Sequence, residues 1–178
     1  ESRLGPVCRR FNLATLHDLV NALKTPRDAS MERAVVEAMT TNETFFFRDR
    51  VPFDLFRDVL LPEALVRRAS QRRLRIWCAA ASTGQKPYSL AMLIQDAAPR
   101  LAGWQVDIVA TDLSTEVLDK AKAGLYSHFE VQRGLPIRQM VRWFEGRPGN
   151  EWLARPELLR EWCTTSSDLK MAALGDLS

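Results

Sequence analysis

Two stretches of the chain place an apolar run, a loop and a helical pattern in the same order. The first has the run LRIWCAA, the loop ASTGQK and the pattern PYSLAMLIQDAA, with Pro87 suited to the first turn of a helix. The second has WQVDIVATDL followed by STEVLDKAKAGL, where Ser114 can cap a helix and Glu116 suits its first turn. Alternating strands and helices predict an α/β fold built on a parallel sheet with right-handed crossovers.

The first forty or so residues predict helices without strands. Apolar residues recur at helical spacing in LHDLVNALK and MERAVVEAM, and TPRDAS between them carries residues that end one helix and cap the next. We therefore expect a small all-α N-terminal domain over residues 1–41, a linker and connecting helix over 42–73, and the α/β domain over 74–178. Further helices are expected from Phe53 to about Ser70, and from just after Pro136 to near Gly146.

Composition narrows the class of protein. No apolar run approaches the roughly 20 residues that cross a bilayer, and the start ESRLGPVCRR lacks the apolar core of a signal peptide, so a cytoplasmic protein is expected. Cys8, Cys78 and Cys163 show no CxxC spacing, and with only two histidines we predict neither disulfides nor a metal site. The net charge of +3 is small and spread along the chain, which disfavours nucleic-acid binding.

The segment MTTNETFFFRDRVPF fits neither a helix nor a strand. Its polar run favours hydrogen bonds from side chains to the backbone, while Phe45 to Phe47 require burial on more than one side. Two interpretations stay open: a linker packed between domains, or a polar string that buried aromatic rings hold in place for a ligand.

Ligands of a doubly wound sheet bind beyond the carboxyl ends of its strands, which here means the loops after Ala80 and Asp112. Asp112 is placed to accept hydrogen bonds from ribose hydroxyls, unless it only begins the turn before the next helix. The loop Ala-Ala-Ser-Thr-Gly matches neither GxGxxG nor a P-loop, which disfavours a dinucleotide or ATP. A nucleoside cofactor without phosphate, such as S-adenosylmethionine (SAM), suits the site better.

Four blocks of sequence occur in an order that is specific in combination: MTTNETFFFRD, LRIWCAAASTGQKPYSLAM, ATDLSTEVLDKAKAGLY and RGLP. They resemble the signature blocks of the CheR family, the chemoreceptor glutamate methyltransferases of bacterial chemotaxis. The resemblance implies a Rossmann-like SAM-dependent methyltransferase sheet, with SAM as cofactor and S-adenosylhomocysteine as product. It also implies that the partners are the cytoplasmic helices of methyl-accepting chemoreceptors, through which alone the protein would lie near the membrane.

The resemblance also implies a set of cofactor-binding residues from several segments. They are Asn42, Thr44 and Arg48 of the first block, Lys86 after the ASTG loop, Asp112 at the ribose, and Asp168 with Leu169 near the adenine. Arg48 is our candidate catalytic residue, because its planar fork can hold a carboxylate bidentately. That carboxylate is either the methionine carboxylate of SAM or the substrate glutamate, and an ordinary salt bridge between domains is the alternative.

The helical start contributes a candidate partner-binding pair. The stretch SRLGPVCRRFNL resembles the receptor-facing helix of the family, and its Arg3 and Arg10 would share a helix face unless Pro6 interrupts the helix. The two arginines would then meet an acidic receptor surface. A basic face exposed to solvent is the alternative.

Two departures from the family pattern bear on activity. The family loop reads Gly-x-Glu-Pro-Tyr-Ser, and Lys86 stands at the glutamate position, so attraction to the cationic methionine end of SAM becomes repulsion unless the lysine turns away into solvent. The chain also stops at Ser178, before an expected Arg-Asn-Val strand with a nearby tyrosine, the remaining strands and a small β-subdomain, so we expect an incomplete sheet. A catalytically impaired scaffold-binding module of the same fold is the main alternative. An NAD-dependent oxidoreductase is disfavoured because the glycine fingerprint is missing.

Overall fold

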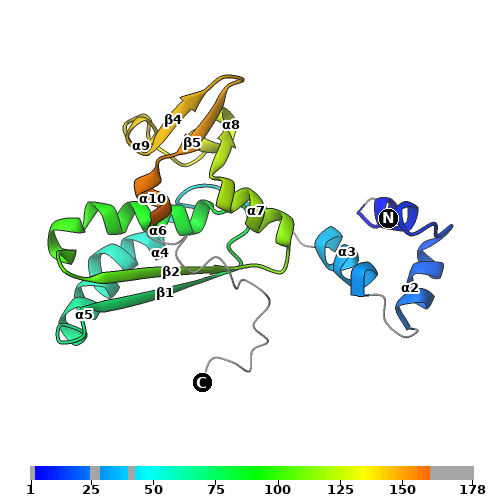
Figure 1. Ribbon diagram of the computed structural model, residues 1–178, viewed down its shortest axis with the longest axis horizontal. Helices are drawn as coiled ribbons and strands as arrows, with labels where there is room; N and C mark the ends of the chain where they lie inside the picture. The colour runs from blue at the N-terminus through cyan, green and yellow to red at the C-terminus, as the bar shows by residue number, and fades with distance from the viewer. Residues whose placement is uncertain (1–2, 25–28, 40–42, 161–178) are drawn as a thin grey trace. The chain divides into compact units, whose positions relative to one another are not determined.

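The computed structural model describes residues 3–24, 29–39 and 43–160, of which 159 and 160 are described by their backbone alone. The chain divides into two compact units, Glu1–Asn42 and Glu43–Ser178, which are considered separately (Figure 1). No helix of the described ranges is long and apolar enough to cross a bilayer.

The first unit contains α1 (Gly5–Arg10), α2 (Leu16–Lys24) and α3 (Ala29–Met39), so the helices expected in LHDLVNALK and MERAVVEAM both form. Thr15 and Asp18 fix the start of α2 by reciprocal bonds: Asp18 Oδ2 accepts from the Thr15 N–H (2.9 Å), and Thr15 Oγ1 accepts from the Asp18 N–H (3.1 Å). The buried core of the unit is small and consists of Val7, Cys8, Leu19 and Ala34.

The second unit begins with a helix in three parts. They are α4 (Arg50–Leu55), the π-helical turn η1 (Phe56–Leu60) and α5 (Leu61–Arg67), which agree with the helix expected from Phe53 to about Ser70. Pro62 lacks an N–H, and its ring would press on the carbonyl group four residues earlier in a regular α-helix. The wider η1 turn lies at that carbonyl, that of Asp58, which explains how one helix accommodates the proline.

The two strand–helix repeats of the sequence form as predicted. They are β1 (Arg73–Ala79) with α6 (Gln85–Asp96), and, after the short 3₁₀-helix η2 (Ala98–Leu101), β2 (Gln105–Thr111) with α7 (Thr115–Ala123). The strands pair in parallel from Arg73 opposite Gln105 to Ala79 opposite Thr111. Buried side chains of α5, α6, η2 and β1 pack together. The helices α5 and α6 therefore lie on the same face of the β1–β2 pair (Figure 1). The α/β fold class is confirmed.

A second, antiparallel sheet follows, with strand order β3-β5-β4. Its parts are β3 (Leu125–Ser127), α8 (His128–Gln132), α9 (Ile137–Trp143), β4 (Phe144–Arg147) and β5 (Glu151–Ala154), after which α10 (Pro156–Arg160) begins. The helix expected to reach Gly146 ends at Trp143, because Phe144–Arg147 pairs with β5. We expected no small β-subdomain before Ser178, and this expectation is wrong, because a small antiparallel sheet lies between Leu125 and Ala154.

Phe46 lies where the parts of the second unit meet. It is fully buried, and its ring lies edge-on to those of Tyr126 and Phe144, each with a centroid distance of 5.4 Å. Gly134 of the RGLP block has φ +99°, and a Cβ there would lie 2.0 Å from the Phe46 carbonyl oxygen. Glycine is therefore needed at position 134 because the two backbones touch.

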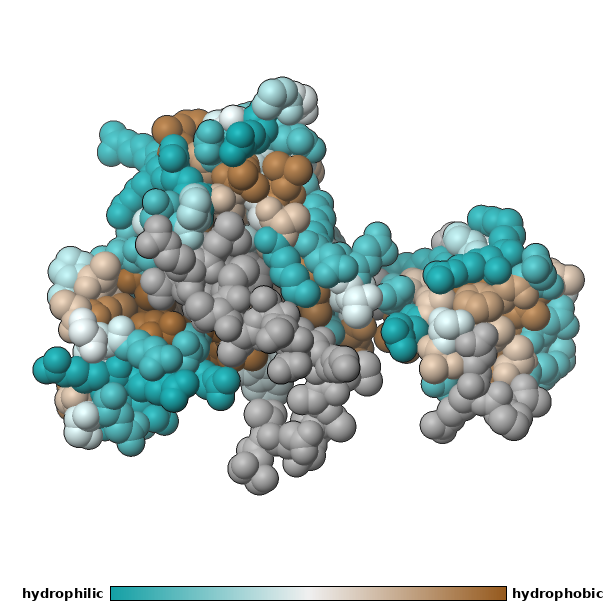
Figure 2. Space-filling model, in the orientation of Figure 1, coloured by the Kyte–Doolittle hydropathy of each residue, from teal (hydrophilic) through white to brown (hydrophobic). Residues whose placement is uncertain are grey.

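Apolar side chains are also exposed around the small sheet. Phe129 of α8 and Ile137 and Val141 of α9 are each more than half exposed. Figure 2 shows hydrophobic surface over this region, beside hydrophilic surface. Ile137 and Val141 are one helical turn apart, so they lie on the same side of α9.

Candidate cofactor site

The loop after β1 turns tightly at the carboxyl edge of the parallel pair. The Ala81 N–H donates to the Thr111 carbonyl (3.0 Å), which extends the contact between the strands by one step. The backbone then has positive φ at Ala80 (51°), Ser82 (50°) and Gly84 (97°). The small side chains of this loop leave its backbone open to a ligand at the edge where ligands of such sheets bind.

Asp112 connects the two loops of this edge. Its Oδ2 accepts from the Ser82 N–H (2.8 Å), and its Oδ1 accepts from the Ser114 N–H (3.1 Å). Ser114 in turn caps α7, because its Oγ accepts from the Val117 N–H (3.4 Å), as the sequence predicted. A carboxylate can accept about four hydrogen bonds. The half-buried Asp112 therefore keeps acceptor sites with which it can bind ribose hydroxyls, and that role stays a prediction.

Lys86 reaches the same edge from the first turn of α6. Its Nζ lies 3.5 Å from the Ala79 carbonyl oxygen and 3.4 Å from that of Ala80. The side chain is exposed, and its ammonium group lies at the carboxyl end of β1. Its charge also acts on Cys78: burial raises the pKa of this thiol to about 11, and the nearby lysine opposes that rise.

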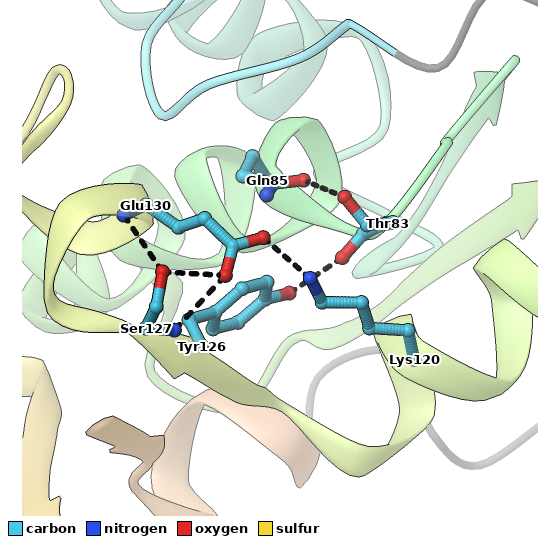
Figure 3. Close-up of polar contacts among 6 residues, drawn as sticks. All are labelled: Thr83, Gln85, Lys120, Tyr126, Ser127 and Glu130. Carbon is cyan, nitrogen blue, oxygen red and sulfur yellow. Dashed lines mark hydrogen bonds and ion pairs between the residues drawn. The ribbon is translucent and has the colours of Figure 1, made fainter. Parts of the chain in front are cut away.

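Buried side chains support the loop from behind (Figure 3). The Tyr126 hydroxyl donates to the Thr83 carbonyl oxygen (2.7 Å), and Thr83 Oγ1 donates to Oε1 of the buried Gln85 (2.8 Å). Burial, with smaller contributions from Tyr88 and Glu130, raises the pKa of Tyr126 well above its ordinary value, so the hydroxyl stays a donor. Sequence analysis missed both Tyr126 and Gln85.

An ion pair continues this support into the small sheet. Lys120 of α7 and Glu130 of α8 approach to 2.5 Å. Glu130 also completes a capping box with Ser127: its carboxylate accepts from the Ser127 N–H (2.9 Å), and Ser127 Oγ accepts from the Glu130 N–H (3.3 Å). The start of α8 is thereby tied to α7, beside the tyrosine that supports the cofactor loop (Figure 3).

The first signature block is anchored on α6. The Phe47 N–H donates to Oγ of the buried Ser89 (2.9 Å), and that hydroxyl donates to the Gln85 carbonyl oxygen (2.7 Å). With Phe46 fully buried, its ring holds this segment in place, which agrees with both interpretations of the segment. Thr44, two residues before Phe46, is half-buried. Its contact with the cofactor stays a prediction.

Arg48 lies against its own segment. Its guanidinium donates to the Glu43 carbonyl oxygen, lies 5.9 Å from the Phe45 ring centroid and approaches Asp49 to 3.8 Å. Arg133 of the RGLP block lies over the same ring at 4.7 Å and pairs with the Glu43 carboxylate at 3.0 Å. Two guanidinium groups therefore lie near the Phe45 ring, and sequence analysis named only Arg48.

The remaining predicted residues fall elsewhere. Asn42, Asp168 and Leu169 lie outside the described residues. The expectation that Arg3 and Arg10 share a helix face is wrong, because α1 begins at Gly5 with proline in its first turn, and Arg3 precedes it. Arg3 donates to the Met39 carbonyl oxygen (3.4 Å), and the Arg10 guanidinium lies 5.6 Å from the centroid of the neighbouring phenylalanine ring.

Residues 42–174 match the family model described as the CheR methyltransferase, SAM binding domain. The chain belongs to the CheR methyltransferase family. It is 42% identical over 146 residues to a chemotaxis protein methyltransferase of Vibrio anguillarum, which covers 81% of this chain and 52% of that protein. It is 40% identical over 160 residues to chemotaxis protein methyltransferase 1 of Pseudomonas aeruginosa, covering 88% and 58% of the two chains.

A third relative, the chemotaxis protein methyltransferase of Escherichia coli, is 36% identical over 156 residues, which are 86% of this chain and 51% of that protein. The chain thus spans about half the length of the curated relatives that it matches. The SAM-binding CheR domain identifies S-adenosylmethionine as the cofactor.

The described residues fit this cofactor with one exception. The loop of small residues exposes Ala79 and Ala80 at the carboxyl edge, and Asp112 has acceptor sites to spare for a ribose. Lys86 is the exception, because it fixes a positive charge at an edge that receives a positively charged cofactor.

Proposed function

We propose that the protein transfers the methyl group of SAM to glutamate side chains on the cytoplasmic helices of chemoreceptors, which forms glutamate methyl esters in chemotaxis adaptation. One observation carries this proposal: three signature blocks of the CheR SAM-binding domain converge at the start of α6. Lys86 and Asp112 meet the loop after β1, and Phe47 meets Ser89 one turn into the helix. The names of the relatives support chemotaxis as the setting.

Methyl transfer to a carboxylate requires that the reacting groups be positioned, and it does not require acid–base residues. Bound SAM supplies a methyl group on a cationic sulfur, which a carboxylate oxygen attacks in line. A glutamate with a pKa near its usual value of about 4.3 is already ionised at pH 7, so no general base is needed. The protein has to orient the carboxylate and exclude water around it.

We assign the orienting role to Arg48. The Glu43 carbonyl, the Phe45 ring and the Asp49 carboxylate at 3.8 Å use only part of its guanidinium, which has five N–H donors in a fixed fork. The remaining donors suit a bidentate contact with a carboxylate, either of the methionine part of SAM or of the substrate glutamate. A lysine would supply a point charge without the fork.

The second candidate is a methyltransferase-fold module that binds receptors or signalling scaffolds without efficient turnover. The observation that favours it is the ammonium group of Lys86 at the cofactor edge. Repulsion between two unit charges about 4 Å apart is about 1 to 4 kcal/mol, depending on the local dielectric, which would weaken SAM binding.

The test is transfer of labelled methyl from SAM to a chemoreceptor cytoplasmic fragment, read as base-labile methyl ester on glutamate. We expect transfer by the parent and at least a tenfold lower rate for Arg48→Lys, with Arg147→Lys on exposed β4 as the matched control. Calorimetric binding of SAM accompanies the assay. Binding without transfer would support the scaffold module, and undiminished transfer by Arg48→Lys would refute the role of the arginine.

A further inference from the structure

We infer that Arg133 of the RGLP block is a positioning residue for Arg48, and that it acts through Glu43. This role rests on the proposed function, in which the Arg48 guanidinium orients a carboxylate for methyl transfer. The family match assigns no role to Arg133, and the sequence pattern alone did not point to it.

The Arg48 guanidinium is held by groups of its own segment. It donates to the Glu43 carbonyl oxygen, lies 5.9 Å from the centroid of the Phe45 ring and approaches the Asp49 carboxylate to 3.8 Å. The hydrogen bond to the Glu43 carbonyl is the closest of these contacts. The direction in which the fork of donors points therefore depends on where Glu43 lies.

The two ends of this segment are anchored differently. Phe46 is fully buried, and the Phe47 N–H donates to Oγ of the buried Ser89 (2.9 Å). The Glu43 side chain is 62% exposed, and among the described residues its carboxylate pairs with Arg133, at 3.0 Å. The core thus holds the later part of the segment, while the ion pair holds its exposed beginning.

The backbone that carries Arg133 is fixed on both sides. Its N–H donates to the Phe129 carbonyl oxygen of α8 (3.1 Å). The next residue, Gly134, lies so close to the first signature block that a Cβ there would be 2.0 Å from the Phe46 carbonyl oxygen. Arg133 therefore reaches the first block from a backbone that touches it.

The Arg133 side chain contacts the same two residues as Arg48. Its guanidinium lies 4.7 Å from the centroid of the Phe45 ring and pairs with the Glu43 carboxylate. Such an exposed ion pair contributes little to the free energy of unfolding, because water solvates both charges when they separate. It does restrict where the Glu43 carbonyl lies. Loss of Arg133 should therefore loosen the Arg48 fork more than it destabilises the fold.

Two other roles would give different results. An arginine that binds the substrate carboxylate by itself would contribute to transfer whether or not Arg48 is present. An arginine that only stabilises the fold would act on unfolding and on every activity alike. A residue that acts through Arg48 has no further effect once Arg48 is replaced, which is a coupling that a double-mutant cycle measures.

The experiment is such a cycle, measured on methyl transfer from SAM to a chemoreceptor cytoplasmic fragment. Arg133→Gln is introduced into the parent and into Arg48→Lys, and Glu43→Gln into the same two backgrounds. The matched control is Arg142→Gln, because this arginine also forms an ion pair, with Asp96 at 2.9 Å, and lies 4.4 Å from the centroid of the next residue's ring. Melting curves check the fold of each variant.

We expect Arg133→Gln to lower the rate of transfer about threefold to tenfold in the parent, because it removes an ion pair and a cation–π contact that together restrain Glu43 and Phe45. The same substitution should leave the rate of Arg48→Lys unchanged. Glu43→Gln should show the same pattern with a smaller loss. Arg142→Gln should transfer methyl like the parent.

A second measurement follows Arg48 without turnover. NMR of protein with isotope-labelled arginine gives the rate at which each guanidinium rotates about its Cζ–Nε bond, and Arg48→Lys identifies the signal of Arg48 by its loss. We expect rotation at least about threefold faster in Arg133→Gln and faster also in Glu43→Gln. Arg142→Gln should keep the parent rate.

The remaining outcomes would overturn the positioning role. It is refuted if Arg133→Gln slows transfer equally in the parent and in Arg48→Lys, if rotation of Arg48 does not change, or if Arg142→Gln has the same effects. Parent values of transfer and rotation in Glu43→Gln would refute the path through Glu43. If the parent transfers no methyl, the proposed function is refuted, and the rotation rates alone decide whether Arg133 positions Arg48.

Discussion

Replacing Asp112 with alanine tests the cofactor site most directly. The carboxylate accepts hydrogen bonds from the N–H groups of Ser82 (2.8 Å) and Ser114 (3.1 Å), and its remaining lone pairs are those predicted to bind the ribose. Asp112→Ala therefore removes two backbone contacts from the free protein and a ribose contact from the complex. Stability and affinity should both fall, each for its own reason.

The two losses have comparable magnitudes. A hydrogen bond to a charged group contributes about 1.5 to 3 kcal/mol when buried, but Asp112 is half exposed, so water replaces part of it. We expect the free energy of unfolding to fall by about 1 to 3 kcal/mol in total. Loss of the charge-assisted ribose contact should cost a further 1 to 3 kcal/mol of binding, roughly a 5- to 150-fold increase in the Kd for SAM.

Ser114→Ala is the matched control at the same turn. It removes the cap of α7, in which Ser114 Oγ accepts from the Val117 N–H, and should cost about 1 kcal/mol of stability while leaving the Asp112 carboxylate in place. Urea unfolding and calorimetric SAM binding are measured for both variants in the same buffer. We expect Ser114→Ala to lose no more stability than Asp112→Ala, and the two variants to differ clearly in their affinity for SAM.

Two results would refute this reasoning. If Ser114→Ala loses as much affinity as Asp112→Ala at equal stability, Asp112 acts by ordering the loop and does not contact the ribose. If folded Asp112→Ala binds SAM like the parent, Asp112 lies outside the site.

Three further predictions follow from the described packing and pKa shifts. Gly134→Ala should lose at least about 2 kcal/mol more stability in urea unfolding than Gly149→Ala, because both positions have positive φ but only a Cβ at 134 would meet the Phe46 carbonyl; equal losses would contradict this. Burial opposes ionisation of Glu130, but its lysine and serine partners hold its pKa below the ordinary value of 4.5. Its stabilising contribution is present above that pH and lost as the pH falls through the lowered pKa, so acid titration should destabilise the parent more than Glu130→Gln. Because burial raises the pKa of Cys78 to about 11, peptide mass mapping should find this thiol unlabelled by maleimide at pH 7.5 until the protein unfolds; rapid native labelling would show that it is accessible.

The parallel pair and its helices were predictable because their signals are local. Each strand is seven residues long and carries β-branched or aromatic residues, and each following helix has a start signal of its own, Pro87 in the first and Ser114 in the second. Ser114 illustrates this: its hydroxyl caps α7 in the structure as its position before TEVLDK predicted. Asp112 was found by a rule of topology, because the fold fixes which ends of the strands face a ligand.

The small sheet could not be predicted in the same way. Its strands have three or four residues, and FEGR continues directly from a helical pattern, so only pairing with EWLA makes it a strand. One signal was available. Pro148, Gly149 and Asn150 separate the two runs, and the last two have positive φ (81° and 63°), as a tight hairpin requires.

The support of the cofactor loop escaped sequence analysis for another reason. Tyr126 and Gln85 appear in the sequence as an ordinary aromatic residue and an ordinary polar residue, and only the fold brings the tyrosine hydroxyl to Thr83, 43 residues away. The pattern of a family block shows which residues face a ligand, but not which buried groups hold the block in place.

This separation between the face of the loop and its support affects how the lysine substitution is interpreted. Tyr126, Thr83 and Gln85 form their hydrogen bonds behind the loop, while Lys86 contacts the carbonyl groups of Ala79 and Ala80 at its front edge. Exchanging the lysine for glutamine or glutamate removes those front contacts and leaves the buried ones intact. The loop should therefore keep its shape, so a change in SAM affinity in a Lys86→Gln or Lys86→Glu variant reports charge and not a collapsed site. Tyr126→Phe is the converse case: it should weaken SAM binding because it removes the support of the loop, while the charge at the edge is unchanged.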